Sequence, residues 1–346
     1  MAIRVGVIGL GFMGRTHLDI HLNNPRAQLT AYCDYDPNRT KGNLSTGGGN
    51  VGTAKKLNID ASKVTAYQDP ADLIADPNVD AVDICLPTYL HAEFAIKALE
   101  AGKFVLCEKP LTVDLKEADR IVAASKKSKG FVMPAHCMRF WPEWDWLKKA
   151  VVSKEFGKVH SATFKRFAAA PGWSANNWIL NPKLSGAALF DLHIHDADFV
   201  RFVFGDPQAV FSVGNGGKST KDGIDHVITN YLFKNPKLVV VAEGGWNADS
   251  SYPFTMRYTV VFDKATADFD AAREGKVLIL HRAGAKEGEV VKVGAKNGWE
   301  LEIDYFLQCI EEKKKPKLIT VQDARDSIAL VHAEAKSIRE RKVVKV

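Results

Sequence analysis

Three ionisable side chains in this chain of 346 residues have the types and the spacing that proton transfer requires. Lys109 lies between Glu108 and Pro110 at the end of an apolar run, and Asp191 precedes His195 by four positions. On a helix, residues four apart share one face. A histidine titrates near neutral pH, so it can take the hydroxyl proton when an alcohol is oxidised to a carbonyl. We therefore predict that Lys109, Asp191 and His195 are catalytic.

The roles within this set follow from the chemistry of the side chains. Asp191 can orient the His195 ring, and Lys109 can donate hydrogen bonds to a substrate oxygen. Either Lys109 or His195 can be the immediate base. His193 and Asp196 add two residue types that bind metals, but residues two apart on a helix diverge by about 200°. The two histidines therefore cannot share an ion, and we expect no metal site.

A glycine-rich segment, Gly9-Leu10-Gly11-Phe12-Met13-Gly14, directly follows the first apolar run. Between a strand and a helix, this GxGxxG spacing indicates a dinucleotide site. Gly9 allows the tight turn, Gly11 lets the backbone approach a pyrophosphate, and Gly14 lets the helix pack on the strand. The helix N-terminus offers free N–H groups to the phosphates. We predict cofactor contacts at Gly9, Gly11, Phe12, Met13 and Gly14.

Asp34 is the predicted partner of the cofactor ribose. It lies 20 residues after Gly14, at the end of the second apolar run, where a carboxylate can accept a hydrogen bond from a 2′-hydroxyl. The same carboxylate repels the additional phosphate of NADP, whose sites usually offer an arginine. Arg39 is near in sequence but lies beyond Pro37. NAD is therefore the predicted cofactor, and NADP is disfavoured.

Two later loops, 86–91 and 108–110, also follow strand-like apolar runs. Ligands of open parallel sheets bind at the carboxyl ends of the strands, where such loops lie. Thr88 is explained equally well as the N-cap of the next helix, and the two roles are compatible. The predicted cofactor contacts in these loops are Leu86, Pro87, Thr88, His91, Glu108 and Lys109.

A parallel sheet must position these loops, because strand and helix patterns alternate through the first 136 residues. Short apolar runs without alternation are typical of strands buried on both faces. Helical patterns over 88–101 and 114–127 separate such runs, and Asp114 with Glu117 has the spacing of a capping box. The predicted strands are 4–9, 28–33, 64–67, 81–86, 103–107 and 131–135. We predict a doubly wound, NAD-binding Rossmann domain over residues 1–136.

The pattern changes after about Arg139, where longer strands show polar alternation. Such strands predict a mostly antiparallel sheet with one exposed face. A helix is expected over 185–204, with two more at 300–313 and 321–340, the last of which is a candidate to pack back on the first domain. The predicted strands are 158–168, 208–213, 224–234, 237–245, 255–262 and 276–281. The fold class is therefore α/β, with a second domain over 137–346 for substrate binding and oligomerisation.

Aromatic residues gather near 140–146 and again at Trp173 and Trp178. The first group is expected to serve a core or an oligomer contact. Trp173 and Trp178 lie in an irregular segment just ahead of Asp191, and rings of this kind can stack on the flat C–H faces of sugars. We predict them as substrate contacts, together with His136 and Arg139 at the domain junction.

Composition excludes several classes of protein. The net charge of +6 is spread along the chain, whereas nucleic-acid binding needs a concentrated basic face. No apolar run is long enough to span a membrane, and the first strand begins at Ile3, which leaves no room for a signal peptide. The five cysteines form no CxxC pair, as expected in a reducing compartment. We expect a soluble cytoplasmic protein, and the Gly47-Gly48-Gly49-Asn50 patch is expected to be a loop because it lacks the lysine of a P-loop.

The order of these motifs resembles the glucose–fructose oxidoreductase, inositol dehydrogenase and rhizopine catabolism (Gfo/Idh/MocA) family over the whole chain. The resemblance implies a C-terminal domain with a large, open, mainly antiparallel sheet, through which members form homodimers or homotetramers. It implies sugar, cyclitol or sugar-nucleotide substrates. It also assigns catalysis to Lys109, Asp191 and His195, and a contact with the nicotinamide ribose to Glu108.

Two departures from the family pattern stand near the predicted site. Ala187 follows Gly186 where many members have paired glycines, and His193 stands where many have glycine. The second departure is expected to place an extra imidazole near the substrate. Two other functions exist among such proteins: cleavage of glycosides with recycled NAD through a transient 3-keto intermediate, and nucleotide-binding regulation without catalysis. Retention of both Lys109 and His195 argues against the regulator.

Overall fold

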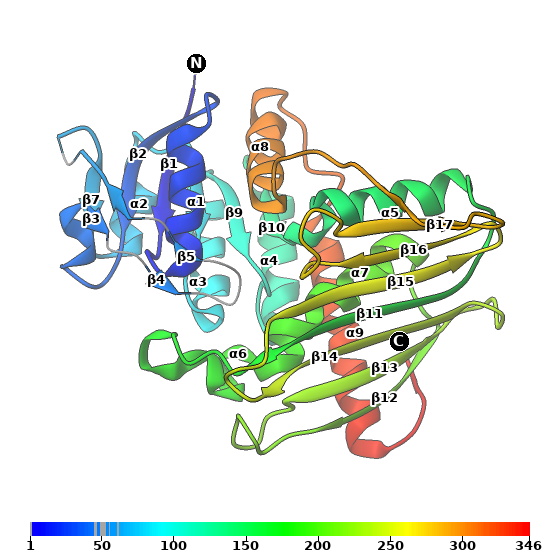
Figure 1. The fold of residues 1–346 in the computed structure, drawn as a ribbon. Coiled ribbons are helices and arrows are strands. Elements are labelled where there is room, and N and C mark those ends of the chain that lie inside the picture. The colour runs from blue at the N-terminus through cyan, green and yellow to red at the C-terminus, as the bar shows by residue number, and fades with distance from the viewer. Residues whose placement is uncertain (1, 45–46, 49–52, 55, 61) are drawn as a thin grey trace. The chain divides into compact units, whose positions relative to one another are not determined.

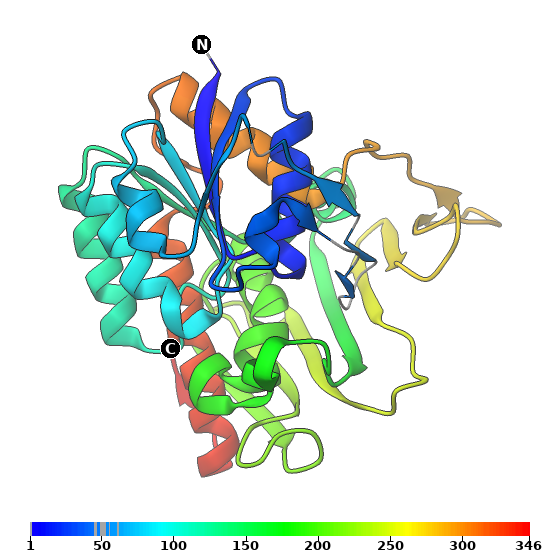
Figure 2. The same cartoon turned by 90° about the vertical axis from the view of Figure 1, so that its left-hand side faces the viewer.

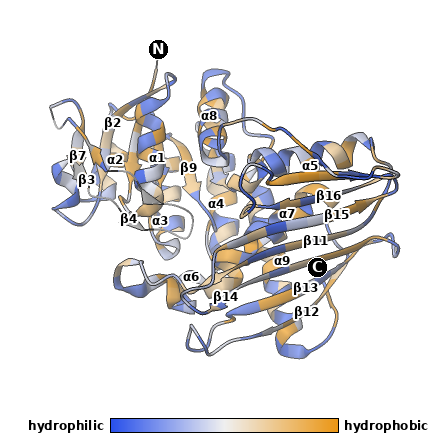
Figure 3. Cartoon of the chain, viewed as in Figure 1, coloured by the Kyte–Doolittle hydropathy of each residue, from blue (hydrophilic) through white to orange (hydrophobic). Residues whose placement is uncertain are grey.

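The computed structural model describes residues 2–44, 47–48, 53–54, 56–60 and 62–346. It divides into two compact units. The first comprises Met1–Cys137 and Gly298–Arg325, and the second comprises Met138–Asn297 and Asp326–Val346 (Figure 1). In both units the strands carry hydrophobic residues for much of their length, as expected for strands that border a core (Figure 3).

The first unit is built on a six-stranded parallel sheet with the order β10-β9-β8-β1-β2-β7. Helices α3 and α4 lie on one face, and α1 and α8 lie on the other (Figure 2). All six predicted strands are present, so the doubly wound Rossmann architecture is confirmed. The strands are β1 (Ile3–Ile8), β2 (Ala27–Cys33), β7 (Thr65–Tyr67), β8 (Ala81–Ile84), β9 (Phe104–Glu108) and β10 (Val132–Ala135); the helices are α1 (Phe12–Asn23), α2 (Pro70–Ala75), α3 (Thr88–Glu100), α4 (Leu115–Lys127) and α8 (Gly298–Glu311).

A short excursion follows β2 in the first unit. After a 3-10 turn at Arg39–Lys41, strands β3 (Asn43–Leu44) and β6 (Leu57–Asn58) pair antiparallel, as do β4 (Gly47–Gly48) and β5 (Thr53–Ala54). The glycine patch was expected to be a loop. Its first two residues instead form β4, whereas Gly49 and Asn50 lie outside the described residues.

The second unit is built on a nine-stranded sheet with the order β18-β17-β16-β15-β11-β14-β13-β12-β19. Its neighbours pair antiparallel except β11 and β14, which are parallel. The predicted mainly antiparallel sheet is confirmed, although the sequence prediction missed β16, β18 and β19. The strands are β11 (Val159–Ala169), β12 (Ala209–Asn215), β13 (His226–Leu232), β14 (Val239–Ala248), β15 (Thr255–Phe262), β16 (Ala265–Asp270), β17 (Leu278–Arg282), β18 (Glu289–Val290) and β19 (Val344–Lys345).

Helices cover one face of this sheet. In the view of Figure 1, α5, α7 and α9 lie behind the strands, and among the described residues no helix lies in front of them. An aromatic cluster fills the covered side: the fully buried Trp144 ring lies 4.7 Å from the Phe199 ring and 5.7 Å from the Phe164 ring. This confirms the core role expected for the first aromatic group. The helices are α5 (Pro142–Ser153), α6 (Pro182–Ser185), α7 (Ile194–Phe204) and α9 (Val321–Glu340).

The two units differ from the predicted domains in the placement of α8. The predicted second domain was the continuous segment 137–346, but residues 298–325 lie with the first unit. The physical reason is that α8 buries Ile303 and Phe306 within the first unit, where Phe306 packs edge-on against Phe131 at 5.8 Å between ring centroids. The chain therefore returns to the first unit after completing most of the second.

Gly14→Ala is expected to destabilise the first unit, because the new Cβ would lie 1.6 Å from the carbonyl oxygen of Gly9. Overpacking of this kind costs about 1–3 kcal/mol or more. Gly11→Ala is the matched control, since its Cβ would have no heavy atom of the described residues within 4 Å. Urea unfolding measures the difference, and equal free energies of unfolding for the two variants would contradict the packing argument.

Candidate functional site

The predicted phosphate turn joins β1 to α1. Gly9 has φ +90°, a conformation that favours glycine, and it brings the turn against the carbonyl group of Cys85. Gly11 is the N-cap of α1, with no side-chain hydrogen bond at the cap. The Cβ position of Gly11 faces open space, so the first N–H groups of α1 are available to an anion there. Phe12 and Met13 are half-buried in the first turn of the helix.

Asp34 is fixed against this turn. Its Oδ2 accepts a hydrogen bond from the N–H of Leu10 at 2.7 Å, and its Oδ1 accepts one from the N–H of Asp36 at 2.9 Å. The side chain is 3% exposed, and Nη1 of Arg39 lies 3.3 Å from Oδ2. The carboxylate is therefore held beside the glycine turn before any ligand arrives, and a guanidinium stands next to it despite the intervening Pro37.

His91 ties together the two loops that were predicted to contact the cofactor. Its Nδ1 lies 2.8 Å from the Pro110 carbonyl oxygen, and its Nε2 lies 2.7 Å from the Leu86 carbonyl oxygen. Burial lowers the pKa of His91 despite these two acceptors. Because both ring nitrogens face the protein interior, the structure favours a positioning role over the predicted direct contact.

Thr88 is not the N-cap of α3, which was one of the two roles that the sequence allowed for it. It is the first residue of α3, and Pro87 is the cap, with no side-chain hydrogen bond. Thr88 is 2% exposed, so its hydroxyl lies within the first turn rather than ahead of it. Proline fixes φ and favours the start of a helix, which explains why the boundary falls one residue earlier than a threonine cap requires.

Glu108 points inward from the end of β9. Its Oε1 lies 3.3 Å from Nε2 of His17, and its Oε2 accepts a hydrogen bond from the N–H of Lys109 at 3.0 Å. Burial would raise the pKa of Glu108, but the hydrogen bond and charge of His17 outweigh burial and lower it. Both oxygens are engaged within the first unit, which argues against the ribose contact implied by the resemblance. Lys109 itself is half-buried.

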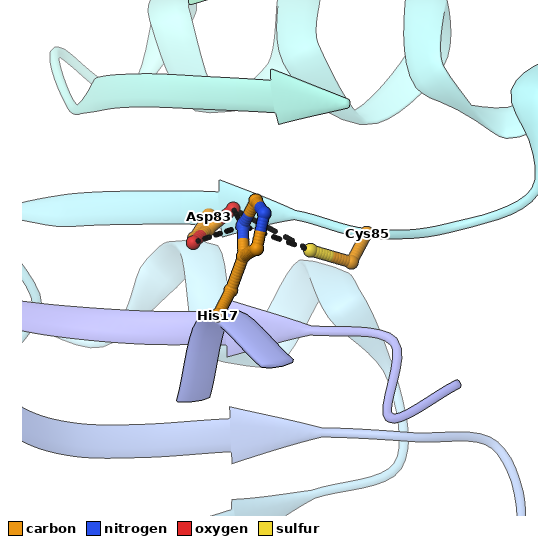
Figure 4. A group of neighbouring side chains, drawn as sticks. All are labelled: His17, Asp83 and Cys85. Carbon is orange, nitrogen blue, oxygen red and sulfur yellow. Dashed lines mark hydrogen bonds and ion pairs between the residues drawn. The ribbon is translucent and has the colours of Figure 1, made fainter. Parts of the chain in front are cut away.

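A polar cluster lies beneath β8 and β9 in the first unit. Asp83 accepts from two histidines of α1. Its Oδ2 is 3.0 Å from Nδ1 of His17 (Figure 4), and it is 2.8 Å from Nε2 of His21. Cys85 Sγ lies 3.5 Å from the same His17 nitrogen. The side chains of His17, His21 and Asp83 are fully buried.

Ligand atoms of His17, Asp83 and Cys85 lie within 4.8 Å of one another, as metal ligands do. In the metal-free protein, burial raises the pKa of the Cys85 thiol well above its usual range. His17 Nδ1 is engaged by Asp83. In the described structure these three side chains form a hydrogen-bonded cluster.

The sequence analysis missed this cluster, although two signals of it were present. Asp83 is a carboxylate inside an otherwise apolar strand, where an unpaired charge is costly. His17 and His21 are four apart on a helix and so share one face. Together these two signals indicate that a carboxylate on a strand pairs with two imidazoles on a helix.

In the second unit, Asp191 and His195 lie on consecutive turns and both are half-buried. Within the predicted helix over 185–204, Gly186 ends α6, and the helical segment that follows contains a π-helical turn at Leu189–His193 and continues as α7. Asp191 lies in the π-helical turn, and His195 is the second residue of α7. Turns of this type are rare and are frequent at functional sites.

His193 does not place an extra imidazole at an open site, as the sequence departure suggested. It is fully buried, with Nε2 3.3 Å from Glu334 Oε2 and 3.4 Å from the Tyr231 hydroxyl. Burial would lower the pKa of His193, but Glu334 outweighs burial and raises it. Because Gly244 leaves room for the ring, with a Cβ position only 2.6 Å from Nδ1, the residue packs against β14.

Arg139 is likewise committed inside the second unit. Its guanidinium makes two hydrogen bonds to Asp198, at 2.8 and 2.7 Å, and lies 4.6 Å from the centroid of the Phe202 ring. The side chain is 3% exposed, which argues against the predicted substrate contact. A buried arginine that loses its carboxylate leaves an uncompensated charge, so this pair has a structural role.

The remaining predicted substrate contacts separate by exposure. His136 is 1% exposed and Trp173 is 42% exposed. Trp178 is half-buried and packs against a cluster that contains Ile179 and Trp246. Of the two tryptophans, Trp173 therefore has the greater surface available to a ligand.

Comparison with known proteins identifies the family. Residues 3–136 match a family described as an oxidoreductase family with an NAD-binding Rossmann fold, and residues 144–268 match the GFO/IDH/MocA C-terminal domain. The chain belongs to the Gfo/Idh/MocA oxidoreductases. The resemblance that the motifs carry is thereby confirmed, and with it the assignment of this Gfo/Idh/MocA protein to the enzymes.

Two relatives match this Gfo/Idh/MocA chain over nearly its whole length. Myo-inositol 2-dehydrogenase of Thermotoga maritima is 28% identical and covers 99% of this chain and 98% of its own. The scyllo-inositol 2-dehydrogenase (NAD(+)) of Bacillus subtilis is 28% identical, with 97% and 94% covered.

Solved structures share the fold. A probable dehydrogenase from Thermotoga maritima has a TM-score of 0.80 at 27% identity, with 99% of this chain and 98% of that chain covered. Levoglucosan dehydrogenase in complex with NADH and levoglucosan has a TM-score of 0.84 at 22% identity, with both chains fully covered. Each helix of the described residues is too short or too polar to cross a lipid bilayer.

Proposed function

We propose that this protein is an NAD-dependent dehydrogenase that oxidises a secondary alcohol of a sugar or cyclitol, or reduces the corresponding ketone. The full-length similarity to two inositol 2-dehydrogenases carries the proposal. The glycine turn, with Asp34 held beside it, supports dinucleotide binding. The exposed Trp173 offers a ring face to a polyol.

The proposed reaction moves a hydride and a proton from one carbinol group. The glycine turn and Asp34 would hold NAD, which would supply the acceptor for the hydride of the carbinol carbon. His195 takes the hydroxyl proton, with Asp191 orienting its ring, and Lys109 donates a hydrogen bond to the developing alkoxide. The C–H and O–H bonds break as the C=O bond forms, so the products are the ketone, NADH and one proton held by the protein.

Lys109→Met and His195→Ala should each slow hydride transfer steeply and leave NAD affinity within about threefold. Positioned proton transfer is typically worth about 10²–10⁴-fold. Because both residues serve one proton path, the double variant should be less impaired than the product of the single effects. Single-turnover reduction of NAD by inositols and sugars is the measurement, since steady-state rates can report product release.

Two exposed residues provide controls for this experiment. Lys116 in α4 and His160 in β11 are exposed, so Lys116→Met and His160→Ala should behave as the wild type does. Wild-type single-turnover rates in both Lys109→Met and His195→Ala would show that the proposed active site is wrong.

NAD is the proposed cofactor because Asp34 lies beside the glycine turn, where a carboxylate can accept a hydrogen bond from the ribose 2′-hydroxyl. We expect NAD to bind at least about tenfold more tightly than NADP. Asp34→Ser should narrow this ratio, because the substitution removes the repulsive carboxylate and leaves Arg39 available to a phosphate. Asp36→Ser is the neighbouring control. Calorimetric dissociation constants for both cofactors decide the matter, and equal affinities in the wild type would refute the preference.

We also propose a homodimer or homotetramer formed through the face of the second sheet that no described helix covers. Alternation along β12, β13 and β14 places Phe211, Val213, Leu232 and Val239 there, each between 36% and 54% exposed. Exposed apolar patches of this kind mark interaction sites. Sedimentation should give a multiple of 38.1 kDa, and Val213→Lys with Leu232→Lys should give the monomer; a wild type that sediments as a monomer at micromolar concentration would contradict this proposal.

The five cysteines are all free thiols, which supports placement in a reducing compartment such as the cytoplasm. Fractionation of the cells that make the protein tests this placement.

A further inference from the structure

A line of buried ionisable groups runs through the first unit to the Lys109 turn. It starts at His21, passes through Asp83 to His17, and reaches Glu108 at the end of β9, with successive contacts of 2.8, 3.0 and 3.3 Å. The four side chains are between 0% and 9% exposed. The line ends where Glu108 accepts a hydrogen bond from the backbone N–H of Lys109. The dehydrogenase mechanism proposed above uses Lys109 but gives the residues behind it no role.

The charge states along this line favour an imidazolium at His17. Burial would lower the pKa of His17, but the hydrogen bonds and charges of its neighbours, among them the carboxylate of Asp83, outweigh burial and raise the pKa well above its usual value. Because burial also raises the pKa of Cys85, that thiol is neutral, and the charge that stabilises the imidazolium is the carboxylate of Asp83. His17 thus places a positive charge between two carboxylates.

Glu302 of α8 is the other ionisable group that faces the cluster. Burial and the charges of Glu108 and Asp83 raise the pKa of Glu302 well above its usual value, with His17 opposing them. Neither of its carboxyl oxygens has a hydrogen-bond partner among the described residues. Glu302 is therefore a neutral acid, and it does not compete with Glu108 for the charge of His17.

Glu108 is the link between this cluster and the proposed chemistry. One of its oxygens lies 3.3 Å from Nε2 of His17, within ion-pair distance, and the other accepts a hydrogen bond from the Lys109 amide. A carboxylate held at both oxygens cannot rotate without losing one contact. The orientation of Glu108 therefore fixes the backbone amide of Lys109, and with it the starting direction of the Lys109 side chain.

We propose that His17 is a positioning residue for hydride transfer: its imidazolium keeps Glu108 ionised and oriented, and Glu108 in turn fixes the backbone of Lys109. This inference rests on the proposed dehydrogenase function for its kinetic consequence. Its structural consequence, the protection of the Lys109 amide, is independent of any substrate.

Two substitutions at His17 separate its two contacts. His17→Asn places an amide near the Nδ1 position and keeps a partner for Asp83, but it cannot reach Glu108. His17→Gln places an N–H donor near the Nε2 position and restores that contact without the charge. His21→Asn is the matched control, because His21 is equally buried, lies one turn further along α1 and contacts Asp83 rather than Glu108 within the described residues.

Hydrogen–deuterium exchange of the peptide that contains the Lys109 amide is the first measurement, with and without NAD. Exchange should accelerate by about tenfold or more in His17→Asn, since the acceptor of that N–H is no longer held. His17→Gln and His21→Asn should exchange as the wild type does. Wild-type exchange in His17→Asn, or equal acceleration in His21→Asn, would overturn the positioning role.

The second measurement is the pH profile of single-turnover NAD reduction. In the wild type His17 lowers the pKa of Glu108, so the active carboxylate persists into acid. Without the imidazolium, burial raises that pKa, and the acidic limb should move to higher pH by about one unit or more. The acidic limb of the profile should move to higher pH in both His17 variants and should stay at its wild-type pH in His21→Asn.

The single-turnover rates of the two His17 variants separate the effect of orienting Glu108 from the effect of the imidazolium charge. At pH 8, His17→Asn should slow single turnover by about 10- to 100-fold, since a displacement of about 1 Å can cost 10²-fold, whereas His17→Gln should recover most of the rate. An unmoved acidic limb in folded His17→Gln would overturn the proposal even if His17→Asn failed to fold. A wild type without polyol-dependent NAD reduction would contradict the proposed function instead, and the exchange measurement would then decide the inference alone.

Discussion

The close approach of α1 to the β1 turn is the constraint on which the first unit depends. No side chain fits between Gly14 and the Gly9 carbonyl group, so the helix begins directly over the carboxyl end of the parallel sheet. That placement aims the N-terminus of α1 at the proposed phosphate position. It also carries His17 and His21 down onto β8, where Asp83 receives them. One backbone contact thus sets both the cofactor turn and the buried charges behind Lys109.

Most of the fold of the first unit was predictable, because the patterns there are local. Unalternating apolar runs mark the six strands, and Asp114 caps α4 through the N–H groups of Lys116 and Glu117, as its spacing predicted. The return of α8 was not predictable. An amphipathic helix reveals which of its faces is apolar, but not which of two sheets that face covers.

The residues of the candidate site also divide into those whose setting follows from local sequence and those whose partners are distant in sequence. The glycine turn lies between a strand and a helix, and Asp34 follows the second strand, as the local sequence patterns predicted. The partners of other candidate residues are distant in sequence and could not be predicted: Arg139 pairs with Asp198, and His193 faces Glu334 from α9. The π-helical turn around Asp191 also escaped prediction, since the sequence shows helical periodicity but not the local insertion that widens one turn.

The return of α8 has a consequence for how the chain is made. Domains tend to fold from the N-terminus during synthesis, yet the first unit lacks one of its covering helices until the ribosome has passed residue 311. Until then α1 covers its face of the sheet without α8, and the polar cluster beside β8 lacks the contribution of Glu302. The nascent protein must therefore hold an incomplete nucleotide domain while nearly all strands of the second sheet are synthesised, which couples the maturation of the two units in time.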